Sequence, residues 1–397
     1  MSLVAHHYWG SPGGGQLVCA AAAFALDRLG LRPALSGTFK FDPAKYVEWY
    51  GIDISHYPIY TLPVGARAFG LWSRLLVWAP AKRALKRHRP QVVFIDEVAY
   101  KPLARGRDFK LVEYVHFPFE VFVDPRFRGT GLAYGEDPYI TERYSKFPLS
   151  LYWRVYVKLL PRVARENPFR YADVVLANSR WTAKVAREVY GEEPKVLNPP
   201  IPPNVEVVKE PRPFEERRPV VVMLGRFSQE KRYHWVVTEV VPRLLKEVPG
   251  AEVVIFGGAA TPTLRAYMEE VRKLAERAGV AKAVRLAPNA PRSDINATMD
   301  KARVFLHATV NEHWGIAVAE AMARGLPVVV HKSGGTWSDL AREGEAGLGY
   351  SSAEEAVEQL ARLLTDRGAW SHYSRKSTER ASDISLESFI SGLSRHV

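Results

Sequence analysis

Short apolar runs rich in valine, isoleucine and leucine alternate with segments of helical periodicity along most of the chain. The runs are continuous, which is typical of strands covered on both faces and so of parallel sheets. They include QVVFID, KLVEYVHF and DVVLANS in the first half, and PVVVMLGRF, AEVVIFGG, AVRLAP, ARVFLHA and LPVVVHK in the second half. The pattern therefore predicts an α/β fold with parallel sheets.

A proline-rich segment, residues 197–219, has neither helical nor strand periodicity and separates the two sets of strands. A chain of 397 residues also suits two domains better than one. We expect two Rossmann-like domains, residues 1–203 and 204–383, with their parallel sheets facing across a cleft. The last amphipathic helix, within residues 384–397, is expected to pack back on the first domain.

Composition and charge narrow the classes of partner. Hydrophobic residues make up 47% of the chain and charged residues 25%, which excludes a disordered or collagen-like protein. The formal net charge of +12 favours polyanions such as phosphorylated substrates, anionic lipid surfaces or nucleic acid. No nucleic-acid recognition module is recognisable, so nucleic acid is not expected as a partner. The single cysteine, Cys19, excludes an internal disulfide and a multi-cysteine zinc site.

The N-terminal residues, MSLVAHHYWGSPGGG, have no basic leader before an apolar run and predict a first strand and loop rather than a signal peptide. The longest apolar run, near residues 17–26, is shorter than the ~20 residues that a membrane-spanning helix needs. We therefore expect a cytoplasmic protein that is peripheral on the inner face of the membrane. A signal peptide and a transmembrane helix are not expected.

Two segments combine aromatic and basic residues in a way that suits a lipid interface. Residues 69–89 place Trp72 and Trp78 beside a dense basic run, and residues 119–170 form a longer aromatic and basic stretch. For the first segment the alternative is a buried helix with a solvated basic end. The second segment could instead bind a lipid-phosphate acceptor or simply pack.

The stretch LHATVNEHWGIAVAEAMARGLPVVV carries the strongest chemical signal in the sequence. A strand ends near Ala308, a polar turn contains Glu312, and a helix starts near Gly315. The backbone N–H groups of Trp314, Gly315 and Ile316 would then point at a ligand, and such helix starts bind phosphate. The stretch therefore predicts a site for the diphosphate of a sugar nucleotide.

Glu320 interrupts the otherwise apolar helical pattern AVAEAMA. An isolated glutamate in a helix usually faces solvent, but this pattern places Glu320 on an apolar face instead. Carboxylates accept hydrogen bonds from vicinal hydroxyls. We therefore expect Glu312 near the sugar and Glu320 near the ribose hydroxyls of one ligand.

The spacing of Glu312 and Glu320, followed by a helix of small residues, Gly-x-Pro and a strand, resembles the signature of glycosyltransferase family 4. The resemblance implies the fold called GT-B, in which two Rossmann-like domains bind a nucleotide-activated sugar. It also implies transfer with retention of anomeric configuration by a front-face route, with the donor's β-phosphate as base. Glu312 is then a ligand of the donor sugar, and no metal or other cofactor is required.

Further segments resemble the same family. MLGRFSQEK is similar to its G-R-x4-K loop, in which Arg226 and Lys231 would hold the donor phosphates; surface cations at a helix start are the alternative. YVHFPF places His116 after a strand, and the family has a histidine at such a site near the donor sugar and diphosphate. The resemblance therefore implies catalytic roles for His116 and Glu312.

Two glycine-rich segments complete the resemblance. HKSGGTWSDL is similar to a later family loop, in which Gly334 and Gly335 would permit close approach of the backbone to a ligand. SPGGGQL is similar to the acceptor-side loop, in which Gly13, Gly14 and Gly15 would admit the diphosphate or acceptor. A plain loop remains an equal alternative for this last segment.

The segments NEHWGIAVAE, HKSGGTWSDL, RFSQEKR, YVHFPF and ADVVLANSRWTAKV resemble a narrower branch of the family. Its members transfer α-1,2-linked mannose from GDP-mannose to the dolichol-linked core oligosaccharide. This likeness implies GDP-mannose as donor and a lipid-linked oligosaccharide as acceptor, in N-glycan or surface glycan assembly. Two features depart from the branch: we expect no N-terminal membrane anchor of the kind that its members have, and the glycine loop reads GGGQ where GGGE is expected.

Two other functions remain open at this stage. The first is a soluble family 4 enzyme that makes a small glycoside or a polysaccharide from a UDP- or ADP-sugar. The second is a GT-B epimerase that converts the sugar nucleotide without an acceptor.

Overall fold

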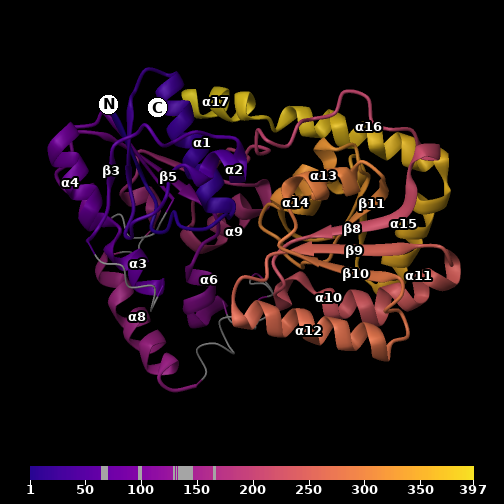
Figure 1. The fold of residues 1–397 in the computed structure, drawn as a ribbon. Coiled ribbons are helices and arrows are strands. Elements are labelled where there is room, and N and C mark those ends of the chain that lie inside the picture. Colours follow the sequence, from indigo (N-terminus) through magenta and orange to yellow (C-terminus); the bar gives the residue numbers. More distant parts are fainter. Residues whose placement is uncertain (64–69, 97–100, 128–129, 131, 133–145, 164–166) are drawn as a thin grey trace. The chain divides into compact units, whose positions relative to one another are not determined.

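The computed structural model (Figure 1) divides the chain into two compact units. The structure describes residues 1–63, 70–96, 101–127, 130, 132, 146–163 and 167–397. The first unit holds the described residues up to Asn204 together with Ile384–Val397, and the second unit is Val205–Asp383. Each unit is built around its own sheet.

Within the described residues, seven parallel strands form the sheet of the first unit in the order β3-β2-β1-β4-β5-β6-β7. The central strands are buried along their whole length, as their continuous apolar sequences predict. The strands are β1 Ser2–Ala5, β2 Pro33–Ser36, β3 Ile59–Tyr60, β4 Val92–Ile95, β5 Lys110–Val115, β6 Val174–Ala177 and β7 Lys195–Val196.

The helices of the first unit include a C-terminal helix that returns to it from the far end of the chain. This helix, α17, packs on α1, and the backbone N–H of Ile201 donates to the carbonyl of Ile384 just before it. The helices are α1 Gly14–Arg28, α2 Lys45–Tyr50, α3 Gly70–Leu76, α4 Trp78–His88, α5 Lys101–Ala104, α6 Glu120–Val123, α8 Leu149–Val163, α9 Arg180–Tyr190 and α17 Leu386–Ser394.

The sheet of the second unit contains six parallel strands in the order β10-β9-β8-β11-β12-β13, counted over the described residues. Its valine-rich strands contribute to a large apolar core that also takes in α11, α12 and α15. The strands are β8 Arg218–Leu224, β9 Glu252–Gly257, β10 Val284–Pro288, β11 Ala302–His307, β12 Val328–His331 and β13 Leu348–Tyr350.

The helices of the second unit lie on both faces of its sheet, with α10 and α12 on one side of β8–β10 and α13 and α14 on the other (Figure 1). A π-helical turn, Val236–Val240, joins α10 to α11. The helices are α10 Tyr233–Trp235, α11 Val241–Glu247, α12 Pro262–Arg277, α13 Arg292–Met299, α14 Ile316–Ala323, α15 Ala353–Thr365 and α16 Arg367–Asp383. The predicted α/β fold with two parallel sheets is confirmed.

Each sheet has a point where the strand order changes direction. In the first sheet β1 lies between β2 and β4, and in the second β8 lies between β9 and β11. The connections that follow such a pair of strands run to opposite faces of the sheet. In open α/β sheets this forms a crevice at the carboxyl ends of the two strands, where ligands bind. Polar residues lie at or just after the carboxyl ends of β1, β4, β8 and β11. A binding site is therefore expected at the ends of these two strand pairs.

The two segments expected at a lipid interface are described in part. In the first, the side chain of Trp78 packs against the apolar core of the first unit, while those of Phe69 and Trp72 lie outside the description. The second contributes α6, α8 and the 3₁₀ turns Pro125–Phe127 and Pro168–Arg170, and residues 128–129, 131, 133–145 and 164–166 lie outside the description. No helix in the described part of the chain is long and apolar enough to cross a membrane.

Candidate active site

Three side chains that follow β8 and β11 meet in the second unit. The Lys231 ammonium donates to Oε2 of Glu312 at 2.7 Å, and Nε2 of His307 lies 3.1 Å from the same oxygen. The side chain of Glu312 is only 13% exposed and that of Lys231 18%. Because β8 and β11 are neighbours in the sheet, the two loops bring together residues 81 positions apart.

The electrostatics of this cluster keep Glu312 ionised. Burial by itself raises the pKa of Glu312, but the Lys231 ammonium and the hydrogen bond with His307 outweigh it and hold the pKa well below its ordinary value. Burial also lowers the pKa of His307. At neutral pH the cluster is therefore a carboxylate, an ammonium and a neutral imidazole.

The Gly334–Gly335 segment contacts the backbone of the loop that carries Glu312. The backbone N–H of Gly335 donates to the carbonyl of Glu312 at 2.7 Å. Gly334 has a positive φ of 73°, and a Cβ there would collide with the backbone of Glu312. The close approach expected at Gly334 is thus made by the chain's own backbone, which fixes the position of the carboxylate.

The start of α14 presents backbone donors beside Glu312. No hydrogen bond among the described residues uses the N–H groups of Gly315 and Ile316. Gly315 has a φ of 94°, and a Cβ on it would lie 2.5 Å from Cγ2 of Thr336. The side chain of Trp314 is buried. The predicted helix start near Gly315 is confirmed, and the geometry suits an anion.

Glu320 lies on α14 with only 4% of its surface exposed, so it does not face solvent. The Arg292 guanidinium, at the start of α13, donates to both of its oxygens, at 2.7 and 3.3 Å. A carboxylate has lone pairs left after such a fork. Glu320 can therefore accept further hydrogen bonds while Arg292 holds it in place.

The two expected phosphate ligands differ in their surroundings. The side chain of Arg226 is 71% exposed and lies 3.3 Å from Glu230, so it is free to turn toward a ligand. Lys231 is instead held by Glu312. Arg232, which no motif singled out, donates to the carbonyl of Ala308 and stacks on Trp235 at 4.3 Å. The loop therefore brings three cations to the carboxyl end of β8.

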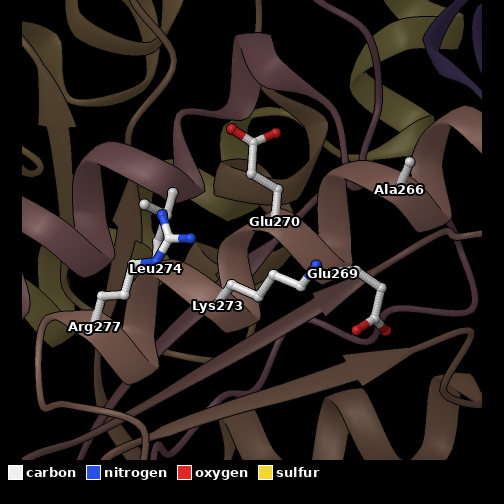
Figure 2. A pocket seen from close by; sticks show the side chains of 6 residues that line it. All are labelled: Ala266, Glu269, Glu270, Lys273, Leu274 and Arg277. Carbon is white, nitrogen blue, oxygen red and sulfur yellow. The ribbon is translucent and has the colours of Figure 1, made fainter.

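A narrow crevice lies at the carboxyl ends of β8 and β11 and is lined by Leu224, Lys231, His307 and Thr309, among others. A second, more open depression is lined by residues of α12 alone, which are Ala266, Glu269, Glu270, Lys273, Leu274 and Arg277 (Figure 2). Its mixed charges are those of an ordinary solvated helix face. The crevice includes Lys231 of the predicted site, whereas the depression includes none of the predicted residues.

A second polar cluster follows β1, β4 and β5 in the first unit. The buried Asp96 carboxylate accepts from Nε2 of His116 at 2.9 Å and from Nδ1 of His6 at 2.8 Å. Burial by itself raises the pKa of Asp96. The two histidines lower this pKa by more than burial raises it, so it lies below its ordinary value. Asp96 is therefore a carboxylate that orients His116, whose side chain is 29% exposed.

The predicted glycine loop lies directly on this cluster. A Cβ on Gly15 would lie 3.2 Å from both Asp96 and His6 and 3.4 Å from His116. The hydroxyl of Tyr50 accepts from the N–H of Gly13 at 2.6 Å and donates to its carbonyl. The small residues that start α1 thus allow the backbone to approach the histidines.

The glycine loop reads GGGQ instead of GGGE, and the glutamine makes a hydrogen bond of its own. The side-chain amide of Gln16 donates to the carbonyl of Tyr8 at 2.7 Å. A glutamate carboxylate has no proton to donate there. Glutamine therefore ties the first turn of α1 to the loop that follows β1 in a way that glutamate does not.

One group of potential metal ligands is present among the described residues, namely His6, Cys19 and Asp96, all buried. His6 and Asp96 are already joined by a hydrogen bond. The group lies in the first unit, whereas the predicted donor-phosphate ligands Arg226 and Lys231 lie in the second. Independence from a metal stays a prediction.

Sequence reasoning missed the partners of the residues it found. His307 and Asp96 each follow a buried strand directly, in VFLHA and VVFID, and that position was the available signal. Arg292 follows the strand AVRLAP by a similar short interval. In each case a charged or polar residue just past a strand end was a candidate that no family motif marked.

The two halves of the chain match two families of known proteins. Residues 204–381 match the family described as "Glycosyl transferases group 1", and residues 12–205 match the one described as "Glycosyltransferase Family 4". The human GDP-Man:Man(3)GlcNAc(2)-PP-Dol alpha-1,2-mannosyltransferase is 26% identical over 98% of this chain and 86% of its own. The Dictyostelium discoideum enzyme of the same name is 22% identical over 90% of this chain and 71% of its own.

Solved structures share the whole fold at low sequence identity. Anabaena HepE in complex with UDP-glucose superposes with a TM-score of 0.67, at 19% identity, over 99% of this chain and 98% of that one. WaaG, a glycosyltransferase involved in lipopolysaccharide biosynthesis, gives a TM-score of 0.65 at 16% identity, over 98% and 97% of the chains. These likenesses establish the GT-B fold.

The first prediction concerns the helix start. Because Gly315 has a positive φ and a Cβ there meets Thr336, Gly315→Ala will move the N–H groups at the start of α14. Strain of this kind corresponds to a loss of about tenfold to hundredfold in affinity for a nucleoside diphosphate. Isothermal titration with GDP and with UDP measures it.

Gly250→Ala is the matched control, since nothing lies within contact of a Cβ at that position. An unchanged affinity in a folded Gly315→Ala protein, or an equal loss in Gly250→Ala, would contradict the role of the helix start.

The second prediction concerns pH and stability. The unfolded chain protonates His307 near the ordinary pKa of 6.5, whereas burial lowers that pKa in the fold. As the pH falls through this range the unfolded chain binds the extra proton, so the fold loses stability. His307→Gln removes this proton and keeps an amide donor for Glu312. Between about pH 7.5 and about pH 5.5 its Tm should fall by about 2–4 °C less than that of the parent protein.

The exposed His372 of the same unit supplies the control substitution, His372→Gln. Thermal unfolding followed by circular dichroism is the measurement. Parallel Tm profiles for the parent and His307→Gln proteins would show that His307 is not buried as a neutral group.

Proposed function

The chain belongs to glycosyltransferase family 4, and we propose that it transfers mannose from GDP-mannose to a lipid-linked oligosaccharide with retention of anomeric configuration. The acceptor is a polyprenyl or dolichyl phosphate-linked glycan in N-glycan or surface glycan assembly. The observation that carries the proposal is the buried cluster of Lys231, Glu312 and His307 beside the unpaired N–H groups that start α14.

The donor is proposed to bind with its diphosphate at this helix start. The N–H groups of Gly315 and Ile316 would donate to phosphate oxygens, and the helix dipole favours the same charge. Lys231 and the exposed Arg226 would add positive charge from the loop after β8. Trp314 supplies packing below the helix start, since its side chain is buried.

The sugar is proposed to lie against Glu312. Its carboxylate is kept ionised by Lys231 and His307, so it can accept hydrogen bonds from sugar hydroxyls. Glu320 would accept from the ribose hydroxyls with the lone pairs that Arg292 leaves open. Gly334 and Gly335 contribute by holding the Glu312 backbone.

The transfer step breaks the bond between the sugar's anomeric carbon and the β-phosphate oxygen. Negative charge develops on the leaving nucleoside diphosphate, where Lys231, Arg226 and the helix start can stabilise it. The acceptor hydroxyl oxygen forms the new bond on the same face, and its proton passes to the leaving phosphate. Protein groups supply all of this stabilisation, so we propose that no metal or other cofactor is needed.

The first unit is proposed to serve the acceptor side. His116, oriented by Asp96, is proposed to contact the donor sugar and its diphosphate, as the family resemblance implies. The loop of Gly13, Gly14 and Gly15 would admit the diphosphate of the acceptor, since its small residues leave the backbone accessible at the start of α1. Asp96 is a positioning residue in this scheme.

The choice of donor rests on the relatives, which are named as enzymes that use GDP-mannose. A second candidate is transfer from a UDP-sugar to a small or polymeric acceptor. It is favoured by the similarity of the whole fold to a protein solved with UDP-glucose. A sugar-nucleotide epimerase is less well supported, since the family matches are to glycosyltransferases.

The test of the function is a donor panel of GDP-mannose, UDP-glucose and UDP-N-acetylglucosamine, each offered with polyprenyl-diphosphate-linked oligosaccharides. Mass spectrometry is expected to find one added hexose with GDP-mannose only. Transfer from a UDP-sugar alone would replace the donor assignment with the second candidate. Conversion of the donor without any acceptor would indicate an epimerase.

The role of Glu312 is tested by Glu312→Ala. Transfer should fall by about a hundredfold to a thousandfold or more, because the sugar loses a charged ligand in the transition state. The affinity for the nucleoside diphosphate should stay within about threefold, because the helix start and Lys231 remain. Initial rates and isothermal titration supply the two numbers.

Glu355→Ala is the matched control, since Glu355 also pairs with a lysine of the second unit but is exposed. It should leave both quantities unchanged. Loss of nucleotide binding in step with activity in Glu312→Ala would assign Glu312 to the diphosphate instead of the sugar.

A further inference from the structure

The helix α8 turns one face to the interior of the first unit and one face outward. Tyr152, Tyr156 and Leu160 are buried, and the last two belong to an apolar cluster with Leu75 and Phe119. This contact fixes the rotation of α8 about its axis. The opposite side of the helix therefore faces away from this apolar cluster and is exposed.

The exposed side carries an apolar stripe. Phe147, Leu151 and Val155 are 79%, 48% and 39% exposed, and they follow one another at intervals of four residues. Leu151 and Val155 lie on α8 itself, whereas Phe147 lies just before the helix, across the cis peptide bond to Pro148. Large apolar side chains exposed this close together are unusual on a soluble surface.

Cations line the same stripe. Arg154, Lys158 and Arg162 are exposed. At 100° per residue they fall with Leu151 and Val155 in one arc of about 100°. The helix contains no aspartate or glutamate, and no ion pair in the described part of the chain involves these three cations. The face is thus both apolar and positive along its whole length.

We propose that this α8 face, formed by Leu151, Val155, Arg154, Lys158 and Arg162 together with Phe147 just before the helix, binds the surface of anionic phospholipid membranes. The apolar side chains enter the boundary between headgroups and acyl chains while the cations contact lipid phosphates. The charge complementarity and the alignment of both kinds of side chain on one helix carry the argument. The proposed function gives this binding a purpose, since the acceptor is lipid-linked, but binding itself requires neither donor nor acceptor.

The helix α4 provides the contrast. Its cations Lys82, Arg83, Lys86 and Arg87 are exposed, but in the described residues no large apolar side chain of α4 is. Trp78 packs against the core, and the Lys82 ammonium lies 5.1 Å from its ring. Within α4, the basic run therefore presents charge without an exposed large apolar side chain among the described residues.

The experiment measures co-sedimentation of the full chain with vesicles, without nucleotide sugar or acceptor. Vesicles of phosphatidylcholine mixed with phosphatidylserine are compared with vesicles of phosphatidylcholine alone. The parent protein should bind the anionic vesicles and release as salt is added. Binding to neither kind of vesicle, or to both equally, would overturn the proposal.

Two variants divide the contributions of the α8 face. Phe147→Ser, Leu151→Gln and Val155→Gln together should weaken binding at least about tenfold. Arg154→Gln, Lys158→Gln and Arg162→Gln together should weaken it by up to about a hundredfold, at about fivefold for each cation. Because all six side chains are exposed, thermal unfolding should match that of the parent protein.

The charge-matched control is Lys82→Gln, Arg83→Gln and Lys86→Gln on α4, which should lose less than about fivefold. An equal or greater loss in this control would move the contact to α4 and overturn the proposal for α8. Vesicle binding without any transfer activity would refute the proposed function alone. Transfer to a water-soluble acceptor by the α8 variants at the parent rate would show that only membrane contact was removed.

Discussion

The arrangement of both polar clusters depends on the strand order of the two sheets. At β1 and β4, and again at β8 and β11, consecutive crossovers leave in opposite directions, and in open α/β sheets a crevice forms at the carboxyl ends of such a strand pair. Side chains that follow these strands converge because neighbouring strands of a sheet lie only about 4.8 Å apart. Asp96 and Glu312 occupy equivalent positions in this sense, each supplied by the strand that crosses the switch point.

Placing a carboxylate in such a crevice is costly unless positive charge or donors accompany it. An isolated buried carboxylate loses several kcal/mol of hydration, which one well-placed partner offsets in part. Glu312 has an ammonium and an imidazole on one oxygen, and Asp96 has two imidazoles. The lowered pKa of each carboxyl indicates that the partners outweigh the cost of burial. Both sites are thereby charged and rigid before any ligand binds.

Three glycines of the two polar clusters admit close neighbours. Gly334 admits the Glu312 backbone, Gly315 lies against the side chain of Thr336, and Gly15 lies against the side chains of Asp96 and the two histidines. Each contact transmits the position of one loop to the next. Glycine motifs that suggest ligand binding therefore also allow the protein's loops to contact one another closely. The two roles are compatible, because a loop that is already held in place loses less entropy when a ligand binds.

Local pattern in the sequence determined the strands, the helix start at Gly315 and the burial of Glu320, because hydrophobic periodicity and helix stops are written within one turn or one strand. It also brought out Glu312, Lys231 and His116 through their resemblance to a known family. The tertiary structure alone decided the partners, since Lys231 reaches Glu312 across 81 positions and Asp96 reaches His116 across 20. Such pairs depend on which strands are neighbours, and that order follows from the packing and handedness of the whole sheet, which no local stretch records.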